Sequence, residues 1–168
     1  MRELKDDVAN VPDFPQPGIM FRDIAPLLRN RFGDTIRAMD ALFSDAEWQR
    51  FDAIAGVESR GFILAAGLST LRGKGFVPVR KKGKLPPPVL HVAYELEYGS
   101  AVLEMQPGYG RVLLIDDVLA TGGTMTAAAE ICSLAGYEVG ALAVLIDLKL
   151  VSGYRWRGIE PRMVIQYP

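Results

Sequence analysis

The sequence predicts an α/β domain built on a mainly parallel, twisted sheet flanked by helices. Short apolar runs of strand length alternate along the chain with longer segments that have helical composition. The most informative stretch, residues 111–124, joins one apolar run to a glycine turn and then to a helix-forming segment. Strands that alternate with helices favour parallel pairing, because each helical crossover returns the chain to the same edge of the sheet.

The expected elements of the N-terminal half follow from apolar periodicity. Residues 34–43 are predicted to form a helix because their apolar side chains share one wide side. The short apolar run 52–57 is predicted to be a buried strand. Residues 61–71 are rich in small side chains and are predicted to form a helix that ends near Gly73. A further strand is expected at 76–79.

The C-terminal half continues the alternation. Residues 89–94 and 101–105 are predicted to be two strands of a hairpin that turns at Tyr98-Gly99-Ser100. The other expected elements are a strand at 112–115, a helix at 123–134, and strands at 141–146 and 163–167. In parallel sheets ligands bind beyond the carboxyl ends of the strands, which is where Asp116 and Thr121 are expected.

Proline and glycine gather in two segments that we expect to be irregular. Residues 11–18 contain three prolines and a glycine, which predicts an extended, turned segment. Residues 83–88 contain a glycine and three consecutive prolines. This second segment follows the densest charge of the chain, which comprises Arg80, Lys81, Lys82 and Lys84. A solvated surface is the usual explanation of such a run, and a site for a dense polyanion is the alternative.

Bulk properties indicate one domain over residues 1–168 and exclude several classes of protein. A chain of this length buries roughly 70% of its unfolded surface. The net charge of −1 offers no reason to expect nucleic-acid binding. The single cysteine, Cys132, cannot form an internal disulfide, so a reducing cytoplasm is expected. Residues 1–10 lack the apolar run of a signal peptide, and no segment has the ~20 apolar residues of a membrane helix.

The chemistry of residues 111–124 points to a ligand with both a phosphate and hydroxyl groups. Gly122 and Gly123 can take left-handed backbone angles, and the helix that follows presents unpaired N–H groups to an anion. Thr121 and Thr124 add hydroxyl donors. The preceding acids, Asp116-Asp117, suit sugar hydroxyls or hydrated magnesium.

A simpler interpretation is an ordinary strand-to-helix turn preceded by solvated acids. The combination of an apolar strand, paired acids, a glycine turn and a small-residue helix favours the phosphate site. Two other phosphate loops do not match. The P-loop requires Lys after its second glycine, but Phe62 follows Gly61, and a Gly-x-Gly-x-x-Gly fingerprint is absent.

The stretch 111–124 resembles the phosphoribosyl-pyrophosphate motif of the type I phosphoribosyltransferases. Four further segments extend this resemblance over nearly the whole chain, and they are 14–24, 58–62, 80–86 and 96–99. The first and last of them are similar to segments of the adenine-specific members. The resemblance implies a type I phosphoribosyltransferase fold with a small N-terminal hood, contributed by about residues 1–33, and a mobile β-hairpin loop.

The activity that the resemblance implies is purine salvage. The 5-phosphoribosyl group would pass from phosphoribosyl pyrophosphate to N9 of adenine, giving AMP and pyrophosphate. Magnesium would bind with phosphoribosyl pyrophosphate, held by substrate oxygens and water without protein ligands. A homodimer is implied as well. The lone histidine, His91, and Cys132 form no zinc pattern, and they are expected to be a loop residue and an apolar helix residue.

The resemblance also implies roles for individual residues. The phosphate and ribose would bind Asp116, Asp117, Ala120, Thr121, Gly122, Gly123 and Thr124. The pyrophosphate would bind Glu58, Ser59, Arg60, Arg80, Lys81 and Lys84, and the residue matching Arg80 can approach a neighbouring subunit's site. Adenine would contact the ring of Phe21, the backbone of Met20 and Arg22, and Tyr98. The catalytic residues would be Arg60 and Glu97, the latter handling a purine proton.

Each of these assignments has an alternative. Phe21 could be a core residue, Arg60 a surface partner of Glu58, and Glu97 a cross-strand partner of a lysine. The chain also departs from the family pattern at Pro87, where glycine is more usual, and a third proline stiffens this loop.

Two other functions are compatible with the fold class. A non-catalytic sensor would bind phosphoribosyl pyrophosphate or a nucleotide, but such proteins usually carry a nucleic-acid module, for which 168 residues leave no room. A sibling transferase would use guanine, hypoxanthine or orotate. The pair of segments around Phe21 and Glu97 favours the 6-amino base, adenine.

Overall fold

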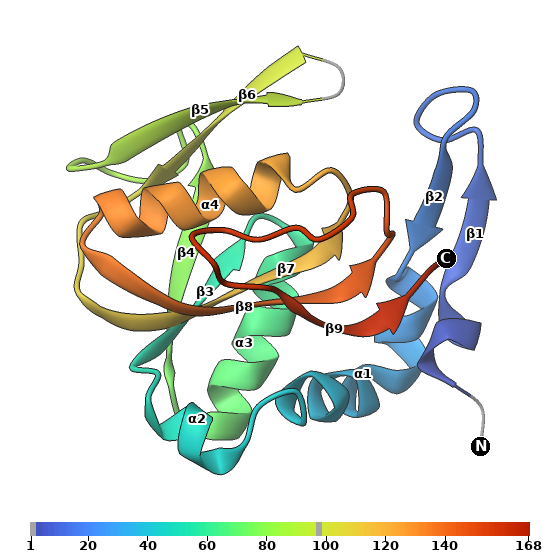
Figure 1. Cartoon of the computed structure of the whole chain (residues 1–168), viewed down its shortest axis with the longest axis horizontal. Helices are drawn as coiled ribbons and strands as arrows, with labels where there is room; N and C mark the ends of the chain where they lie inside the picture. Colours follow the sequence, from blue (N-terminus) through green and yellow to red (C-terminus); the bar gives the residue numbers. More distant parts are fainter. Residues whose placement is uncertain (1–2, 97–98) are drawn as a thin grey trace.

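A seven-stranded sheet forms the centre of the molecule in the computed structural model, which describes residues 3–96 and 99–168 (Figure 1). The strands are β3 (Ala53–Val57), β4 (Gly75–Lys81), β5 (Leu90–Leu96), β6 (Gly99–Met105), β7 (Gly110–Leu119), β8 (Tyr137–Asp147) and β9 (Arg162–Gln166). Their order across the sheet is β5-β6-β4-β3-β7-β8-β9. The run from β4 to β9 is parallel, and β5 and β6 form an antiparallel hairpin at one edge. The mainly parallel sheet is therefore confirmed.

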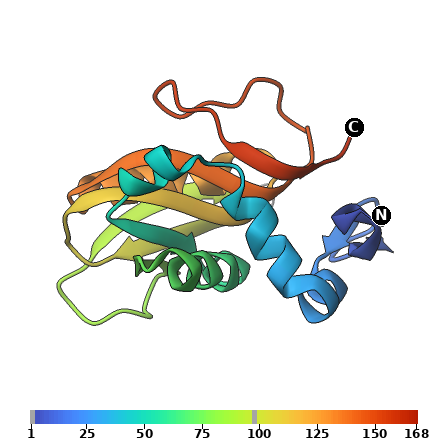
Figure 2. The ribbon, with the colours of Figure 1, turned by 90° about the horizontal axis from the view of Figure 1, so that it is seen from below.

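Helices cover both faces of this sheet. The helices are α1 (Ala25–Asp40), α2 (Asp45–Gln49), α3 (Arg60–Arg72) and α4 (Gly123–Leu134). Residues of α1 and α3 pack in one hydrophobic core, and residues of α4 pack in another on the opposite face. Figure 2 shows α3 and α1 below the sheet.

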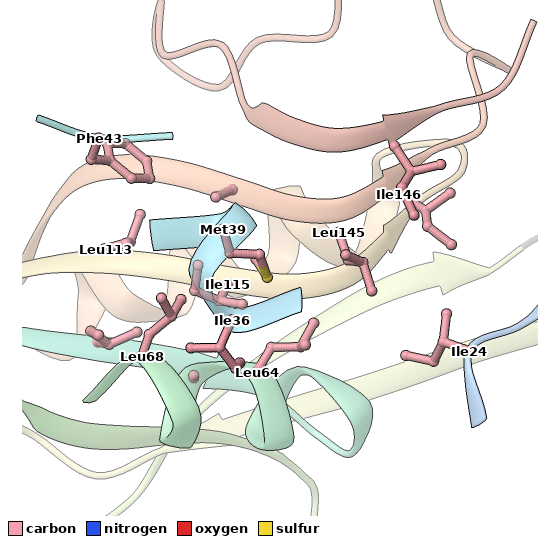
Figure 3. Packing of buried hydrophobic residues seen from close by; sticks show 14 of the residues in the cluster. Ile24, Ile36, Met39, Phe43, Leu64, Leu68, Leu113, Ile115, Leu145 and Ile146 are labelled. Atoms are coloured by element: carbon pink, nitrogen blue, oxygen red, sulfur yellow. The ribbon is translucent and has the colours of Figure 1, made fainter. Parts of the chain in front are cut away.

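Alternation along β7 joins the two cores. Leu113 and Ile115 belong to the core under α1 and α3, whereas Val112 and Leu114 belong to the core under α4. All four are fully buried, as expected of a central parallel strand covered on both faces. Figure 3 shows Leu113 and Ile115 among Leu64 and other side chains of α1 and α3.

The two helices predicted at 61–71 and 123–134 are confirmed almost to the residue. Gly73 ends α3 with a left-handed φ of 62°, a conformation that glycine adopts without a steric penalty. The predicted strands are present, and all except β3 and β9 are longer than predicted. The central strand extends to Leu119, beyond the apolar run at 112–115, because its backbone continues to pair with β8.

The prediction for the first helix was wrong at both ends. The helix covers Ala25–Asp40 instead of 34–43, and it starts with Pro26 in its first turn, where a missing N–H costs little. Arg31, with φ −139° and ψ 36°, interrupts the regular helical geometry. The apolar periodicity is therefore visible only in the part that follows this interruption.

A small hood precedes this helix. It consists of the 3₁₀ helix η1 (Leu4–Asp7) and the antiparallel pair β1 (Ala9–Pro12) and β2 (Met20–Asp23). In Figure 1 the hood stands beyond the carboxyl ends of β7, β8 and β9. The prediction that residues 11–18 contain no regular element was wrong at its start, because β1 ends at Pro12, and the end of an edge strand tolerates proline.

The hood is attached to the end of the chain by two cations. The Lys5 ammonium lies 4.3 Å and the Arg22 guanidinium 4.1 Å from the centre of the Tyr167 ring. Cation–π contacts of this kind contribute about 0.5–1 kcal/mol each at exposed sites. They connect the hood to the residue that follows β9.

None of the helices that the structure describes is both long and apolar enough to span a bilayer.

Candidate active site

The glycine turn lies where β7 ends and α4 begins. Gly122 has a left-handed φ of 89°, and its carbonyl accepts the N–H of Thr126 at 2.9 Å, which closes the first turn of the helix. Gly122 is the N-cap residue and, as a glycine, has no side chain to cap the helix. The first N–H groups of α4, at Gly123 and Thr124, are therefore the donors expected to bind an anion. Thr121 is exposed beside them, and Ala120 is partly buried.

Tyr154 supports this turn and was not anticipated from the sequence. A Cβ placed on Gly122 would lie 2.5 Å from two carbons of the Tyr154 ring, so the ring packs directly against the glycine. The Tyr154 hydroxyl lies 2.9 Å from Oγ1 of Thr126. Tyr154 comes from the connection between β8 and β9, and no local pattern marks this contact.

The paired acids are buried beside the turn. Asp116 and Asp117 are each 7% exposed, and Oδ1 of Asp116 accepts the N–H of Asp117 at 2.8 Å. Burial, and then the neighbouring Asp117 carboxylate, raise the pKa of Asp116 well above its ordinary value. The two carboxylates therefore resist carrying two negative charges together.

Arg60 brings positive charge to this pair from the start of α3. Its Nε lies 2.7 Å from Oδ2 of Asp117, and its side chain is 34% exposed. The guanidinium also lies 5.1 Å from the centre of the Phe21 ring, a residue of the hood. The alternative in which Arg60 pairs with Glu58 was wrong, because the ion pair of Arg60 is with Asp117.

Gly61 allows this close approach between α3 and β7. A Cβ on Gly61 would lie 3.1 Å from the carbonyl oxygen of Ile115 and 3.2 Å from Oδ1 of Asp116. These distances are tighter than an ordinary contact with a methyl group. A side chain at this position would push the start of α3 away from the acids.

Glu58 accepts hydrogen bonds from the basic segment, which is defined as residues 80–86. Its Oε1 accepts hydrogen bonds from Nε and Nη2 of Arg80 at 3.0 and 2.8 Å, and its Oε2 accepts the N–H of Lys81 at 3.2 Å. Burial raises the pKa of Glu58, but the bonds from Arg80 and Lys81 outweigh it, so the pKa lies below its ordinary value. Glu58 is joined to the exposed Ser59 by a cis peptide bond, and Lys84 is also exposed.

The residues expected to bind adenine occupy β2. Met20 is 46% exposed. The Phe21 ring is partly buried and meets the Phe14 ring edge-on at 5.1 Å, so it is not part of the two main cores. The side chain of Arg22 turns away to Asn10 and Tyr167.

Two further expected residues, Glu97 and Tyr98, lie outside the described residues. The strand that leads to them approaches the phosphate turn. A Cβ on Gly123 would be 3.4 Å from the carbonyl oxygen of Glu95 on β5. A cavity of about 390 Å³ lies between this strand and α4, lined by Tyr94, Thr121 and Tyr154 among others.

His91 was predicted to be a loop residue, and this was wrong. It lies within β5, opposite Glu104 of β6, and its Nε2 is 3.4 Å from Oε2 of that glutamate. Cys132 is buried in α4, as predicted, and burial raises the pKa of its thiol to about 12. Within residues 3–96 and 99–168, no three His, Cys, Asp or Glu residues lie close enough together to hold a metal ion.

The arrangement of sheet, acidic pair and glycine turn defines a class of proteins that act on phosphorylated sugars. Residues 28–160 match the family model described as the phosphoribosyl transferase domain. An adenine phosphoribosyltransferase of Hydrogenovibrio crunogenus is 52% identical over 94% of this chain and 92% of its own length. This chain belongs to the adenine phosphoribosyltransferase family.

Solved structures of the family agree with this assignment. The adenine phosphoribosyltransferase of Rhodothermus marinus is 42% identical, covers 97% of this chain and 96% of its own, and superposes with a TM-score of 0.82. That of Saccharomyces cerevisiae, in complex with adenine and an imino-altritol bisphosphate, is 35% identical, covers 95% and 94%, and has a TM-score of 0.85.

Asp116→Asn should make the protein more stable relative to wild type as the pH rises. The folded chain keeps the Asp116 proton at pH values where the unfolded chain, with its carboxyl near 3.8, has lost it. Unfolding of wild type therefore releases a proton, and its free energy falls with pH, by about 1.4 kcal/mol for each unit of raised pKa. Denaturant unfolding at pH 4 to 8 measures the difference.

Asp34→Asn is the control: its pH dependence has the opposite sign and lies at and below the unfolded pKa of about 3.8, so its stability relative to wild type should stay nearly constant from pH 5 to 8. Hydrogen bonds from Arg31 and Arg37 lower the pKa of this exposed carboxyl, so its contribution to stability is present above its unfolded pKa and is lost as the pH falls. If the difference in unfolding free energy between Asp116→Asn and wild type did not change with pH, the raised pKa of Asp116 would be refuted.

Proposed function

We propose that this chain transfers the 5-phosphoribosyl group from phosphoribosyl pyrophosphate to N9 of adenine, forming AMP and pyrophosphate. The observation that carries this proposal is the glycine turn at Gly122, which starts α4 beside the buried pair Asp116-Asp117. Adenine phosphoribosyltransferases about 50% identical to this chain over most of their length support the choice of base.

The phosphate and ribose are assigned to the end of β7 and the turn that follows it. The 5′-phosphate would accept hydrogen bonds from the backbone of residues 121–124 and from the Thr121 and Thr124 hydroxyls. Ribose hydroxyls would donate to Asp117 or Asp116. Because Asp117 already faces Arg60 at 2.7 Å, a bound ribose would share this carboxylate with the guanidinium.

The pyrophosphate is assigned to the turn at Glu58-Ser59-Arg60 and to the basic segment. Arg60 is paired with Asp117, and Arg80 is held next to this turn by Glu58. Lys81 and Lys84 are exposed and add positive charge. A departing pyrophosphate needs this neutralisation, because C1′ of the ribose becomes cation-like as the bond breaks. The Glu58 carboxylate would act through Arg80, since an acceptor cannot bind an anion directly.

Adenine is assigned to the space beside the hood. The Phe21 ring would stack on the purine, an interaction worth about 1–3 kcal/mol per base. The Arg60 guanidinium at 5.1 Å already places a flat cation next to this ring. One edge of β2 pairs with β1, and the residues that the structure describes place no other strand against it. The backbone of Met20 and Arg22 would read the adenine edge, while Tyr98 would pack beside the base and Glu97 would handle its proton.

Magnesium fits the acidic pair through water. Asp116 and Asp117 are adjacent carboxylates beside the turn, and their oxygens could accept hydrogen bonds from the waters of a hydrated cation. Magnesium bound by pyrophosphate and ribose oxygens would neutralise charge on the leaving group. The residues of this chain would then align the ribose with adenine and exclude water, which is the largest task left to the protein.

We assign the chain to one phosphoribosyltransferase domain over residues 1–168 in a reducing cytoplasm. The described helices and strands share one sheet and its hood, and the single cysteine, Cys132, is free and buried. The hairpin of β5 and β6 would be mobile and close over the ligands, since it approaches the turn near Gly123.

A homodimer is also proposed, with its interface on an apolar face that α1, α3 and β4 expose. This face comprises Phe32, Ile63, Leu71 and Phe76, which are 38–51% exposed. A groove of about 570 Å³ runs between α1 and α3. The face continues to the basic segment, because the Phe76 ring packs on Phe62 at 5.4 Å and the Arg80 guanidinium lies 5.9 Å from Phe62. A second copy bound to this face would lie close to the Arg80 side chain of the first copy.

The activity is tested with phosphoribosyl pyrophosphate, magnesium and one base at a time. Pyrophosphate release is expected with adenine and at least 100-fold more slowly with guanine, hypoxanthine or orotate, and a chelator of magnesium should abolish it. Release with another base instead would identify a sibling transferase. Binding of phosphoribosyl pyrophosphate without release with any base would identify a sensor.

Glu97→Gln should lower kcat at least 100-fold and change the KM for adenine less than threefold. The amide keeps the shape of the side chain but cannot accept the purine proton. Steady-state kinetics with Glu138→Gln as the control would separate this role from a general loss of charge, since Glu138 is 66% exposed on its side chain and pairs with Arg111. An unchanged kcat would remove Glu97 from the mechanism.

Ile63→Glu should convert the dimer to a monomer, because a carboxylate would be buried without a partner in an apolar interface. Sedimentation velocity at micromolar concentration measures the mass. Leu134→Glu is the control, since Leu134 is 60% exposed on α4, on the opposite face of the sheet. A wild-type monomer, or dimers of both variants, would reject this interface.

A further inference from the structure

Glu104 of β6 is a buried charged side chain that the proposed reaction does not use. It is only 1% exposed. Its Oε1 accepts the N–H groups of Lys84 and Leu85 at 2.6 and 2.5 Å, and its Oε2 accepts the N–H of Gly83 at 2.9 Å. Three successive amides of the basic segment therefore converge on one carboxylate.

The ionised state of this carboxylate follows from its partners. Burial raises the pKa of Glu104, but the three amide bonds and the nearby His91 outweigh burial, and its pKa lies below the ordinary value. A buried anion that accepts three backbone N–H groups resembles an anion site built from a turn, with the anion supplied by the protein itself. Gly83 contributes the left-handed φ of 87° that such a turn requires.

The residue that follows β6 adds a further contact. Nε2 of Gln106 donates to the carbonyl oxygen of Pro86 at 3.1 Å, so consecutive residues from Gly83 to Pro86 are hydrogen-bonded to the end of β6 and to the residue after it. The N–H of Lys82 donates to the Val102 carbonyl at 3.0 Å. The start of the basic segment is thus hydrogen-bonded to β6.

The backbone that Glu104 binds also contacts the side chain of Arg80. Nη1 of Arg80 donates to the carbonyl oxygen of Lys84 at 3.3 Å, and Nε and Nη2 donate to Glu58 at 3.0 and 2.8 Å. Glu58 immediately precedes the Ser59-Arg60 turn. A continuous set of hydrogen bonds therefore runs from Glu104 through Lys84 and Arg80 to the turn assigned to pyrophosphate.

We propose that Glu104 is a positioning residue for pyrophosphate: it fixes the backbone at 83–85, and this backbone places Arg80 and Lys84 for the leaving group. The proposal rests on the pyrophosphate site of the proposed function. In this proposal the conformation of the basic segment depends on Glu104, which lies 20 positions after Lys84 on the neighbouring strand β6. Preset cations stabilise a developing charge better than cations that must first be ordered.

Glu104→Gln tests the proposal in the full-length protein. The amide keeps the shape, but its NH2 group would face at least one loop N–H. The Kd for pyrophosphate, from calorimetry with magnesium present, should rise at least tenfold, and the KM for phosphoribosyl pyrophosphate should rise with it. The Kd for AMP, which has no pyrophosphate, should change less than twofold. Glu138→Gln should leave both constants unchanged.

A merely structural Glu104 would lower the melting temperature and leave the Kd for pyrophosphate unchanged in the folded fraction, and that result would overturn the proposal. Hydrogen exchange of wild type gives a second test that holds even if Glu104→Gln fails to fold. The amides of Gly83, Lys84 and Leu85 should exchange at least 100-fold more slowly than unprotected amides. Unprotected exchange there would also overturn it.

Failure of the underlying function has a different signature. Wild type would then release no pyrophosphate with adenine and would not bind pyrophosphate. An active wild type whose pyrophosphate affinity is insensitive to Glu104→Gln rejects this inference alone.

Discussion

Two carboxylates buried side by side at the end of β7 are the constraint on which the rest of the site depends. Burying a second negative charge next to the first is unfavourable unless a cation or hydrogen-bond donors compensate. The raised pKa of Asp116 shows this cost, and the contact of Asp117 with Arg60 shows the compensation. Because Arg60 is the first residue of α3, the position of that helix is tied to the acids. Gly61 removes the side chain that would keep them apart.

The same principle extends over the sites assigned to pyrophosphate. Each of its two arginines is held by an acid of the chain, Arg60 by Asp117 and Arg80 by Glu58. The backbone N–H groups of residues 83–85, which follow Arg80, donate hydrogen bonds to Glu104. An incoming polyanion would therefore meet cations that are already ordered and would exchange partners with them. Such an exchange requires little reorganisation, which is the condition for effective electrostatic stabilisation.

Much of the fold could be predicted because its signals are local. The helices at 61–71 and 123–134 were recognised from small residues and glycine ends, and both match α3 and α4 within one residue. The two strands of the hood were not predicted, because β1 and β2 are four residues each and are defined by pairing with one another. The first half of α1 was missed because Pro26 and the interruption at Arg31 hide its periodicity.

The sequence by itself determined the sheet, the glycine turn and the acidic pair, since an apolar run and a glycine constrain the backbone wherever they occur. Tertiary structure alone decided which charges meet. The contacts of Arg60 with Asp117 and of Tyr154 with Gly122 join residues far apart in the chain. Glu58 was considered as an alternative partner of Arg60 because it is near along the chain, but the ion pair is with Asp117. Coulomb attraction and packing act over ångströms in space, and only the folded chain sets those distances.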